Sequence, residues 1–140
     1  MLRLGIVDFD SSHSIEFTQR FNHVGVTPDE WVEGARVEFG WPGTSQMAPE
    51  RIAGFAKQVA DCGVRLVDSP GEMIGKIDGV LVLSLCGSAH LERVEPFLQA
   101  GVPSFVDKPF ACIYADAERM VARARESRTL LFNSSALTYA

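Results

Sequence analysis

The strongest constraint on the fold comes from residues 78–111, where two strand-like runs enclose one helical pattern. Residues 79–85 are almost continuously apolar, which is typical of a parallel strand that is covered on both faces. Ser88 is well suited to begin a helix, and Gly101 is well suited to end it. Residues 104–106 then form the next expected strand. Two strands joined through a helix make a βαβ unit, and such a unit pairs its strands in parallel.

The same alternation of strands and helices extends over the whole chain. We expect strands at residues 2–7, 35–39, 64–67, 79–85, 104–106 and 130–132. Apolar residues at helical spacing mark the helices between them: Phe17, Phe21 and Val24; Ile52, Phe55, Ala56, Val59 and Ala60; Leu91, Val94 and Leu98; Ala117, Met120, Val121 and Ala124. Crossovers between parallel strands are right-handed, so the simplest fold class is α/β: a Rossmann-type doubly wound parallel sheet in three layers.

Composition excludes several classes of partner. The net charge of -5 provides no basic field for a nucleic-acid backbone, so we expect no nucleic acid as a partner. No apolar run approaches the roughly 20 residues that span a membrane, and no signal peptide is evident, so we expect no membrane contact. Cys62, Cys86 and Cys112 are odd in number and far apart in sequence, which favours reduced thiols in a cytoplasmic protein and no structural metal.

The order of these parts resembles the nucleotide-binding domain of the glucose-fructose oxidoreductase and inositol dehydrogenase family, Gfo/Idh/MocA. In that family a buried strand, a helix, a turn and an acid-Lys-Pro motif follow one another with the spacing of residues 79–111, and here the motif is Asp107-Lys108-Pro109. The resemblance implies NAD or NADP as cofactor and hydride transfer on a sugar-like or polyol substrate. It implies that Lys108 is the catalytic residue, which would polarise the reacting oxygen.

The resemblance also assigns residues after the fourth strand to the cofactor site. His90 corresponds to the family's histidine, although Cys86-Gly87 replaces the Pro-Asn that the family has before it. Ser84 and Cys86 would line the cofactor crevice at the carboxyl ends of the strands. The alternatives are small residues used for packing and an exposed histidine in the first turn of a helix.

Family members carry a second domain, so the resemblance implies that this chain is part of a longer one. We expect residues 1–132 to form the NAD(P)-binding domain and residues 133–140 to begin the connection to a C-terminal domain. The family's substrate pocket and its dimer-forming sheet belong to that second domain. We therefore expect the 140 residues alone to turn over no small-molecule substrate, and any homo-oligomer to form through the missing part.

The turn after the first strand departs from the usual dinucleotide fingerprint. Asp8, Asp10 and His13 occupy the three positions where G-x-G-x-x-G places glycines, and Ser11 and Ser12 lie between them. We assign all five residues to the cofactor site. A carboxylate about 4 Å from a phosphate costs roughly 1 kcal/mol in water and about 4 kcal/mol at a protein surface. If either aspartate points into the site, dinucleotide affinity should fall roughly tenfold to a thousandfold. Alternatively, the aspartates turn away and cap the following helix.

Two other functions are compatible with the same residues. The first is a Rossmann-like domain that binds a ligand without catalysis. The second is a haloacid dehalogenase-like phosphatase, in which Asp8 would attack phosphorus and Asp10 would act as acid and base beside magnesium. The phosphatase lacks its final acidic pair, because the last expected strand runs into Asn133-Ser134-Ser135.

Overall fold

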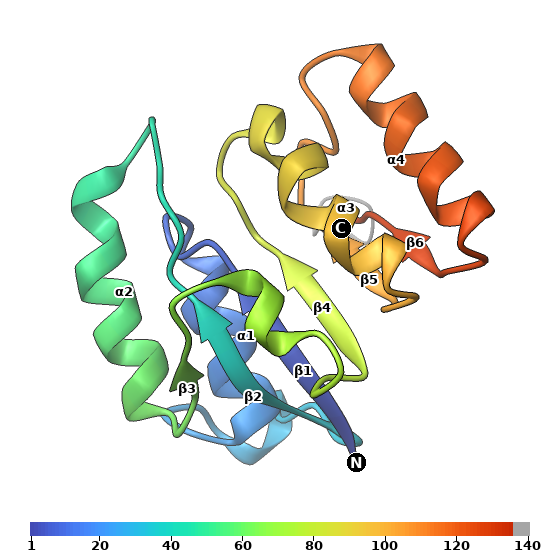
Figure 1. Ribbon diagram of the computed structural model, residues 1–140. Helices are drawn as coiled ribbons and strands as arrows, with labels where there is room; N and C mark the ends of the chain where they lie inside the picture. Colours follow the sequence, from blue (N-terminus) through green and yellow to red (C-terminus); the bar gives the residue numbers. More distant parts are fainter. Residues whose placement is uncertain (136–140) are drawn as a thin grey trace.

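A six-stranded parallel sheet with helices on both faces forms the core of the computed structural model, which describes residues 1–135 (Figure 1). The strand order is β3-β2-β1-β4-β5-β6, which confirms the doubly wound Rossmann-type fold. The strands are β1 (Leu2–Val7), β2 (Ala35–Trp41), β3 (Arg65–Leu66), β4 (Gly79–Val82), β5 (Ser104–Val106) and β6 (Leu131–Phe132). The α-helices are α1 (His13–Asn22), α2 (Pro49–Asp61), α3 (His90–Gln99) and α4 (Tyr114–Glu126), and short 3₁₀ turns are η1 (Pro28–Glu30), η2 (Pro70–Met73) and η3 (Gly87–Ala89).

Each face of the sheet has its own apolar core. Helices α1 and α2 cover one face over β1 and β2, where Ile6 and Val37 are fully buried. Helices α3 and α4 cover the other face over β4 and β5, where Val82, Phe97 and Met120 are fully buried. The strands run upward in Figure 1, so the loops that follow β1, β2, β4 and β5 gather along one edge of the sheet.

The expected elements are all present, with shifted ends. β2 extends to Trp41, two residues beyond the expected end, because Gly40 and Trp41 continue the pairing with β1. The fourth strand ends at Val82 rather than Leu85, since residues 83–86 turn to form the loop before η3. Gly101 ends the segment after α3 with φ +75°, a conformation that glycine adopts freely.

The buried face of α1 differs from the expected one. The buried residues are Ser14, Ile15, Thr18 and Asn22, whereas Phe17 and Phe21 are only partly buried and Val24 is exposed beyond the end of the helix. Small polar side chains allow the helix to lie close to the sheet, and the hydroxyls of Ser14 and Thr18 donate to backbone carbonyls one turn or less before them. The phenylalanines therefore lie beside the helix and cover neighbouring strands.

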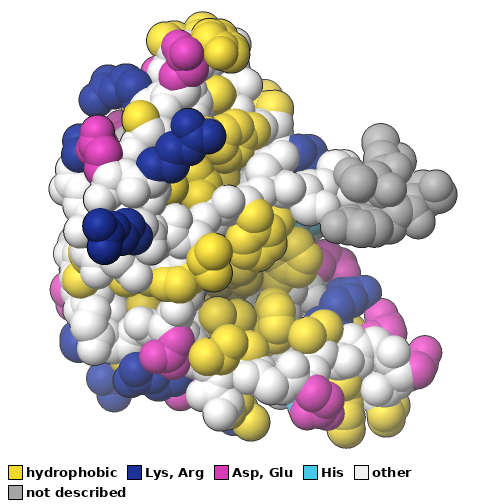
Figure 2. Space-filling model, turned by 90° about the vertical axis from the view of Figure 1, so that its right-hand side faces the viewer, with side chains coloured by type: hydrophobic (Ala, Val, Ile, Leu, Met, Phe, Trp, Pro, Cys, Tyr) yellow, Lys and Arg dark blue, Asp and Glu magenta, His cyan; other side chains and the backbone are white. Residues whose placement is uncertain are grey.

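Part of the sheet remains uncovered beside β6, the last strand in the order. On the α1 side, Phe17, Phe21, Leu81, Phe105 and Phe132 line an apolar hollow of about 280 Å³. Figure 2 shows hydrophobic side chains exposed over this side of the molecule. Phe132 remains 59% exposed and Leu130 remains 73% exposed. Separately, none of the helices in residues 1–135 is long and apolar enough to cross a membrane.

Candidate functional site

Three loops at the carboxyl ends of β1, β4 and β5 are tied together by polar side chains. Asp8 follows β1 and accepts a hydrogen bond from the hydroxyl of Ser84, which follows β4, at 2.5 Å. Asp10 accepts a hydrogen bond from the backbone N–H of Leu85 at 3.0 Å. His13 pairs through Nδ1 with the carboxylate of Asp107, which follows β5. The sequence assigned these residues to one site, and the structure brings them together.

Asp8, at the first fingerprint position, has a backbone conformation that glycine adopts freely. Its φ is +67°, a left-handed value that costs a non-glycine residue energy. The side chain is 1% exposed and lies under Gly43, where an added Cβ would be 1.7 Å from Oδ1 of Asp8. Burial raises the pKa of Asp8, while its bonds with Ser84 and Arg93 act in the opposite direction. Because this carboxylate is enclosed, the geometry argues against its attack on phosphorus in a phosphatase.

Arg93, in the first turns of α3, is the partner that makes a buried Asp8 tolerable. Its Nε donates to Oδ2 of Asp8 at 3.1 Å, and its guanidinium lies 4.8 Å from the centre of the Trp41 ring. Its Nη2 donates to the hydroxyl of Thr44 at 3.0 Å. Arg93 therefore joins α3 to the end of β2 and to the loop that follows it.

A polar cavity of about 280 Å³ lies between these loops. It is lined by Asp10, Thr44, Ser45, Gln46, Ser84, Cys86, Ser88, Ala89, Glu92 and Arg93. Two of its charged groups, Asp10 and Glu92, are acidic, and the third, Arg93, is already paired with both Asp8 and Glu92. A phosphate in this cavity would therefore meet a net negative charge.

Neither aspartate of the first turn caps α1, so this part of the alternative is wrong, whereas the carboxylate of Asp8 does turn away from the cavity. The backbone N–H of His13 donates instead to the hydroxyl of Ser11 at 3.2 Å, and the side chain of Ser12 caps no helical N–H. Ser11 is buried and Ser12 is exposed. The carboxylates of Asp8 and Asp10 are thus directed toward the β2 and β4 loops rather than toward the helix.

Lys108 lies at the same edge of the sheet, directly after the residue that pairs with His13. Its backbone N–H donates to Oδ1 of Asp107 at 2.8 Å, which fixes the chain at this point, and the peptide bond to Pro109 is cis. The side chain of Lys108 is exposed, and within residues 1–135 its ammonium makes no hydrogen bond or ion pair. This ammonium is available to a ligand at the edge of the sheet.

His90 is fully buried, so the alternative of an exposed histidine is wrong. Its Nε2 lies 2.8 Å from the carbonyl oxygen of Ser84, and its Nδ1 lies 3.1 Å from that of Phe110. A neutral imidazole donates only one of these two bonds. The ring connects the β4 loop to the loop after β5 inside the protein, and no part of the ring reaches solvent.

Sequence reasoning missed Arg93 and the hydroxyl residues Thr44 and Ser45. A signal for Arg93 exists, because a cation in the first turns of a helix opposes the helix dipole unless a specific anion compensates it. Thr44 and Ser45 lie in a loop rich in glycine and proline, and nothing in their spacing indicates a site. No group of three or more His, Cys, Asp or Glu side chains within residues 1–135 could hold a metal ion.

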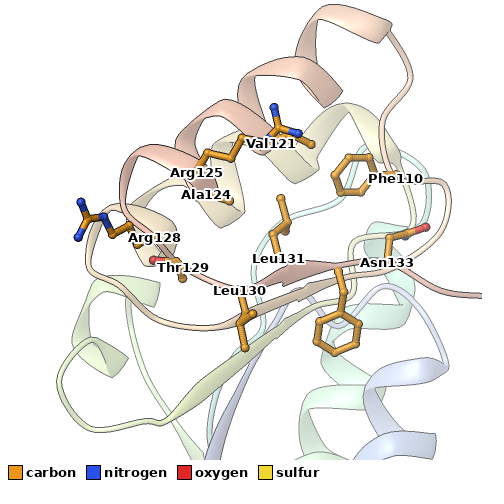
Figure 3. Close-up of a pocket in the computed structure, with 10 residues that line it drawn as sticks. Phe110, Val121, Ala124, Arg125, Arg128, Thr129, Leu130, Leu131 and Asn133 are labelled. Atoms are coloured by element: carbon orange, nitrogen blue, oxygen red, sulfur yellow. The ribbon is translucent and has the colours of Figure 1, made fainter.

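A second hollow, of about 490 Å³, lies away from these loops, between α4 and β6 (Figure 3). Leu131 points from β6 toward α4, and Val121 and Arg125 of α4 lie above it. Phe110 closes the end of the hollow that lies nearest to β5. Its walls are largely apolar side chains, and no acid among residues 1–135 lines it, so its chemistry differs from that of the polar cavity.

Comparison with known proteins agrees with the fold. Residues 45–134 match the family model described as an oxidoreductase family with an NAD-binding Rossmann fold, Gfo/Idh/MocA. Among curated proteins, none matches the sequence.

Solved structures resemble the chain over almost its whole length. A probable dehydrogenase from Thermotoga maritima is 20% identical with a TM-score of 0.74, over 95% of this chain and 36% of that one. Biliverdin reductase from Synechocystis sp. PCC 6803, in complex with biliverdin and NADP+, is 26% identical with a TM-score of 0.68, over 95% and 37%. Scyllo-inositol dehydrogenase from Lactobacillus casei, with NAD(H) and scyllo-inositol, is 20% identical with a TM-score of 0.67, over 96% and 36%. The chain spans little more than a third of the length of these proteins.

Proposed function

The chain belongs to the Gfo/Idh/MocA oxidoreductase family, and from this we propose that its polar cavity binds a nicotinamide dinucleotide for hydride transfer. The observation that supports this best is the position of the cavity. It lies at the carboxyl ends of β1, β2 and β4, where the strand order reverses and where open α/β sheets bind their ligands. When bound, the nicotinamide would supply or accept the hydride.

The residues of the cavity fit a dinucleotide, at reduced affinity. Asp8 has a left-handed backbone that glycine adopts freely, and Gly43 allows the β2 loop to approach it closely. Thr44, Ser45 and Ser88 offer hydroxyls to phosphate and ribose oxygens. The carboxylate of Asp10 opposes a phosphate, so binding should be weaker than in a glycine-only turn.

We propose NADP(H) rather than NAD(H) as the preferred cofactor. NAD-binding sites hold the ribose 2′-hydroxyl with an acid that follows the second strand, whereas an arginine there accommodates the 2′-phosphate of NADP. Residues 41–48 contain no acid that could hold the 2′-hydroxyl in this way. Biliverdin reductase, the 26% identical structure, was solved with NADP+.

Lys108 is proposed as the catalytic residue of the whole protein. It follows β5 at the same edge as the cavity, its backbone is fixed by Asp107, and its ammonium is unpaired within residues 1–135. An ammonium at this position can polarise a hydroxyl or carbonyl oxygen while hydride moves at the attached carbon. We propose a sugar-like or polyol substrate, the class that the scyllo-inositol dehydrogenase binds.

We further propose that residues 1–132 form a domain of a longer chain, which begins to connect to the next domain after β6. The polar cavity is formed within residues 1–135, whereas two hollows flank the short edge strand β6 and leave Phe132 exposed. The solved relatives are more than two and a half times as long. The remainder of the longer chain would cover the hollows and supply the substrate pocket, so the 140 residues alone should show no turnover.

Titration with NADPH and NADH tests the cofactor proposal. Trp41 stacks against Arg93 beside the cavity, so its fluorescence should change on binding, and Trp31→Phe removes the other tryptophan signal. We expect saturable binding of both cofactors, with NADPH bound more tightly. An absence of saturable binding at millimolar cofactor would contradict the dinucleotide site and favour a non-catalytic domain with another ligand.

A further inference from the structure

Two cysteines lie in adjacent loops beside the polar cavity. Cys86 follows β4 and lines the cavity, while Cys112 lies in the loop between β5 and α4 and is exposed. Their loops touch through backbone atoms. A Cβ added to Gly87 would lie 2.8 Å from the carbonyl oxygen of Pro109 and 3.1 Å from the carbonyl carbon of Ala111. Each cysteine is thus one residue away from this contact.

The surroundings of Cys86 favour its thiolate. Its Sγ and the hydroxyl of Ser88 are hydrogen-bonded at 3.0 Å. Hydrogen bonds with Ser88, together with a weaker one from the thiol of Cys112, lower the pKa of Cys86, whereas burial and the nearby Asp10 oppose this shift. Cys62 differs from Cys86 in its exposure and in its pKa. It is only 5% exposed, and burial raises the pKa of its thiol. Of the three thiols, Cys86 thus has surroundings that lower its pKa, Cys112 is exposed, and Cys62 is buried.

We propose that Cys86 and Cys112 form a peroxide-sensitive pair that closes to an intramolecular disulfide and tightens the loops around the polar cavity. The Cys86 thiolate attacks one oxygen of hydrogen peroxide, the O–O bond breaks, and the products are a sulfenic acid on Cys86 and, after proton uptake, water. The sulfur of Cys112 then attacks the sulfur of the sulfenic acid, and a second water leaves. In total, two thiols are oxidised by two electrons, and one peroxide is reduced to two waters.

The disulfide affects the cavity because Cys86 is part of its wall. Joining the β4 loop covalently to residues 109–112 fixes Cys86, which lines the cavity together with Asp10 and Ser84. It also holds the chain directly after Lys108. A dinucleotide that needs the β4 loop to adjust would then bind less tightly. This effect rests on the proposed function, whereas formation of the disulfide does not.

The disulfide is tested first, on the complete 140-residue chain. After treatment with equimolar hydrogen peroxide and alkylation of the remaining thiols, peptide mass mapping should find Cys86 joined to Cys112 and Cys62 alkylated. Reduction with a dithiol should restore all three free thiols. An oxidised protein in which these two cysteines are not joined, or in which Cys62 reacts first, would overturn the pair.

Variants separate the roles of the two thiols. In Cys112→Ser the sulfenic acid should persist on Cys86, where dimedone traps it, because the resolving thiol is gone. In Cys86→Ser the Cys112 thiol should stay reduced under the same treatment. Ser88→Ala should slow oxidation, because it removes the side-chain hydrogen bond that favours the Cys86 thiolate. Trapping on Cys112 instead of Cys86 would contradict the assignment.

Cofactor affinity provides the last readout. The oxidised wild-type chain should bind NADPH at least severalfold more weakly than the reduced chain. In Cys112→Ser no disulfide can form between the two loops, so peroxide should not produce this loss of affinity. Equal affinities of the oxidised and reduced chains would overturn the effect on the cavity. If the reduced chain binds no dinucleotide, the proposed function fails, and the peptide mapping still decides whether the thiol pair exists.

Discussion

The turn after β1 and the unit from β4 to β5 border the same cavity but depart from the family pattern to different extents. The β4–α3–β5 unit keeps the expected order and ends in Asp107-Lys108-Pro109. The turn after β1 has lost all three fingerprint glycines. Its backbone nevertheless has a left-handed conformation at Asp8, with φ +67°, which glycine adopts freely.

This difference separates the shape of the site from its charge. Arg93 and Ser84, both from the β4–α3 part, hold the carboxylate of Asp8 away from the cavity. Residues of the β4–α3–β5 unit thus compensate for the aspartate in the turn after β1, and the carboxylate of Asp8 does not fill the cavity. Asp10 still lines the cavity, so the charge has changed and should weaken phosphate binding.

The largest effect should come from breaking the ion pair that joins the two regions. Arg93→Ala leaves Asp8 buried without its cation and should lower the free energy of unfolding by about 3–5 kcal/mol. Urea denaturation measures this loss. Arg123→Ala removes an arginine from the more exposed pairs with Glu95 and Glu126 and should cost less than about 1 kcal/mol. Equal losses in both variants would show that Arg93 does not support the turn.

A somewhat smaller effect is expected where the β2 loop covers Asp8. In Gly43→Ala the new Cβ would meet Oδ1 of Asp8 at a φ of +70°, so we expect a loss of about 2–4 kcal/mol. Gly34→Ala is the matched control, because its φ is +88° but nothing lies within 4 Å. The control should lose only about 1 kcal/mol of backbone strain. Thermal or urea denaturation of both variants tests the close approach, which equal losses would contradict.

Removing the charge that distinguishes the first turn should strengthen cofactor binding. Asp10→Asn keeps an oxygen that can accept the hydrogen bond from Leu85 but removes the carboxylate, and should tighten NADPH binding about tenfold. Fluorescence titration measures the change. Glu118→Gln on α4, away from the cavity, makes the same change in net charge and should leave the affinity within about twofold. Unchanged affinity in Asp10→Asn would mean that this carboxylate does not face a phosphate.

The smallest effect is the pH dependence of stability, which should have opposite signs at the two ends of β1. The folded pKa of Asp8 is raised above 3.8, so its contribution to stability should fall as pH rises from 3.8 through the raised value. Hydrogen bonds from Arg3 lower the pKa of Asp78 to about 2, so its contribution is present above 3.8 and is lost as pH falls toward 2. Denaturation over this pH range gives the free energy of unfolding as a function of pH. Its slope should be flatter than in the wild type above pH 3.8 in Asp8→Asn, and below pH 3.8 in Asp78→Asn. Unchanged slopes would contradict both assignments.

The fold could be predicted from the sequence because two of its signals are local. These are the spacing of the apolar residues and the glycines and prolines that end helices and strands. The apolar run after Asp78 and the helix end at Gly101 indicate one βαβ unit without knowledge of the rest of the chain. The buried face of α1 could not be predicted this way. Its small polar residues, such as Ser14 and Thr18, are buried because the helix lies close to the sheet, and that is a tertiary property.

The candidate site could be placed at the strand ends but not completed. Asp8, Ser84 and Asp107 follow strands, and strand ends converge at one edge of a parallel sheet. Arg93 enters the site from a helix across 85 residues of sequence separation, and no local pattern indicates that contact. The direction in which each carboxylate points is also set by these distant partners.

Mapping the cofactor on the backbone amides by NMR tests the central claim most directly. With increasing NADPH, we expect saturable shifts in residues 8–13, 41–46 and 84–93, which form the loops around the polar cavity. Residues 121–132, which line the hollow beside α4, should remain unchanged. Shifts confined to that hollow, or no saturable shifts at millimolar NADPH, would contradict a dinucleotide site between the two regions.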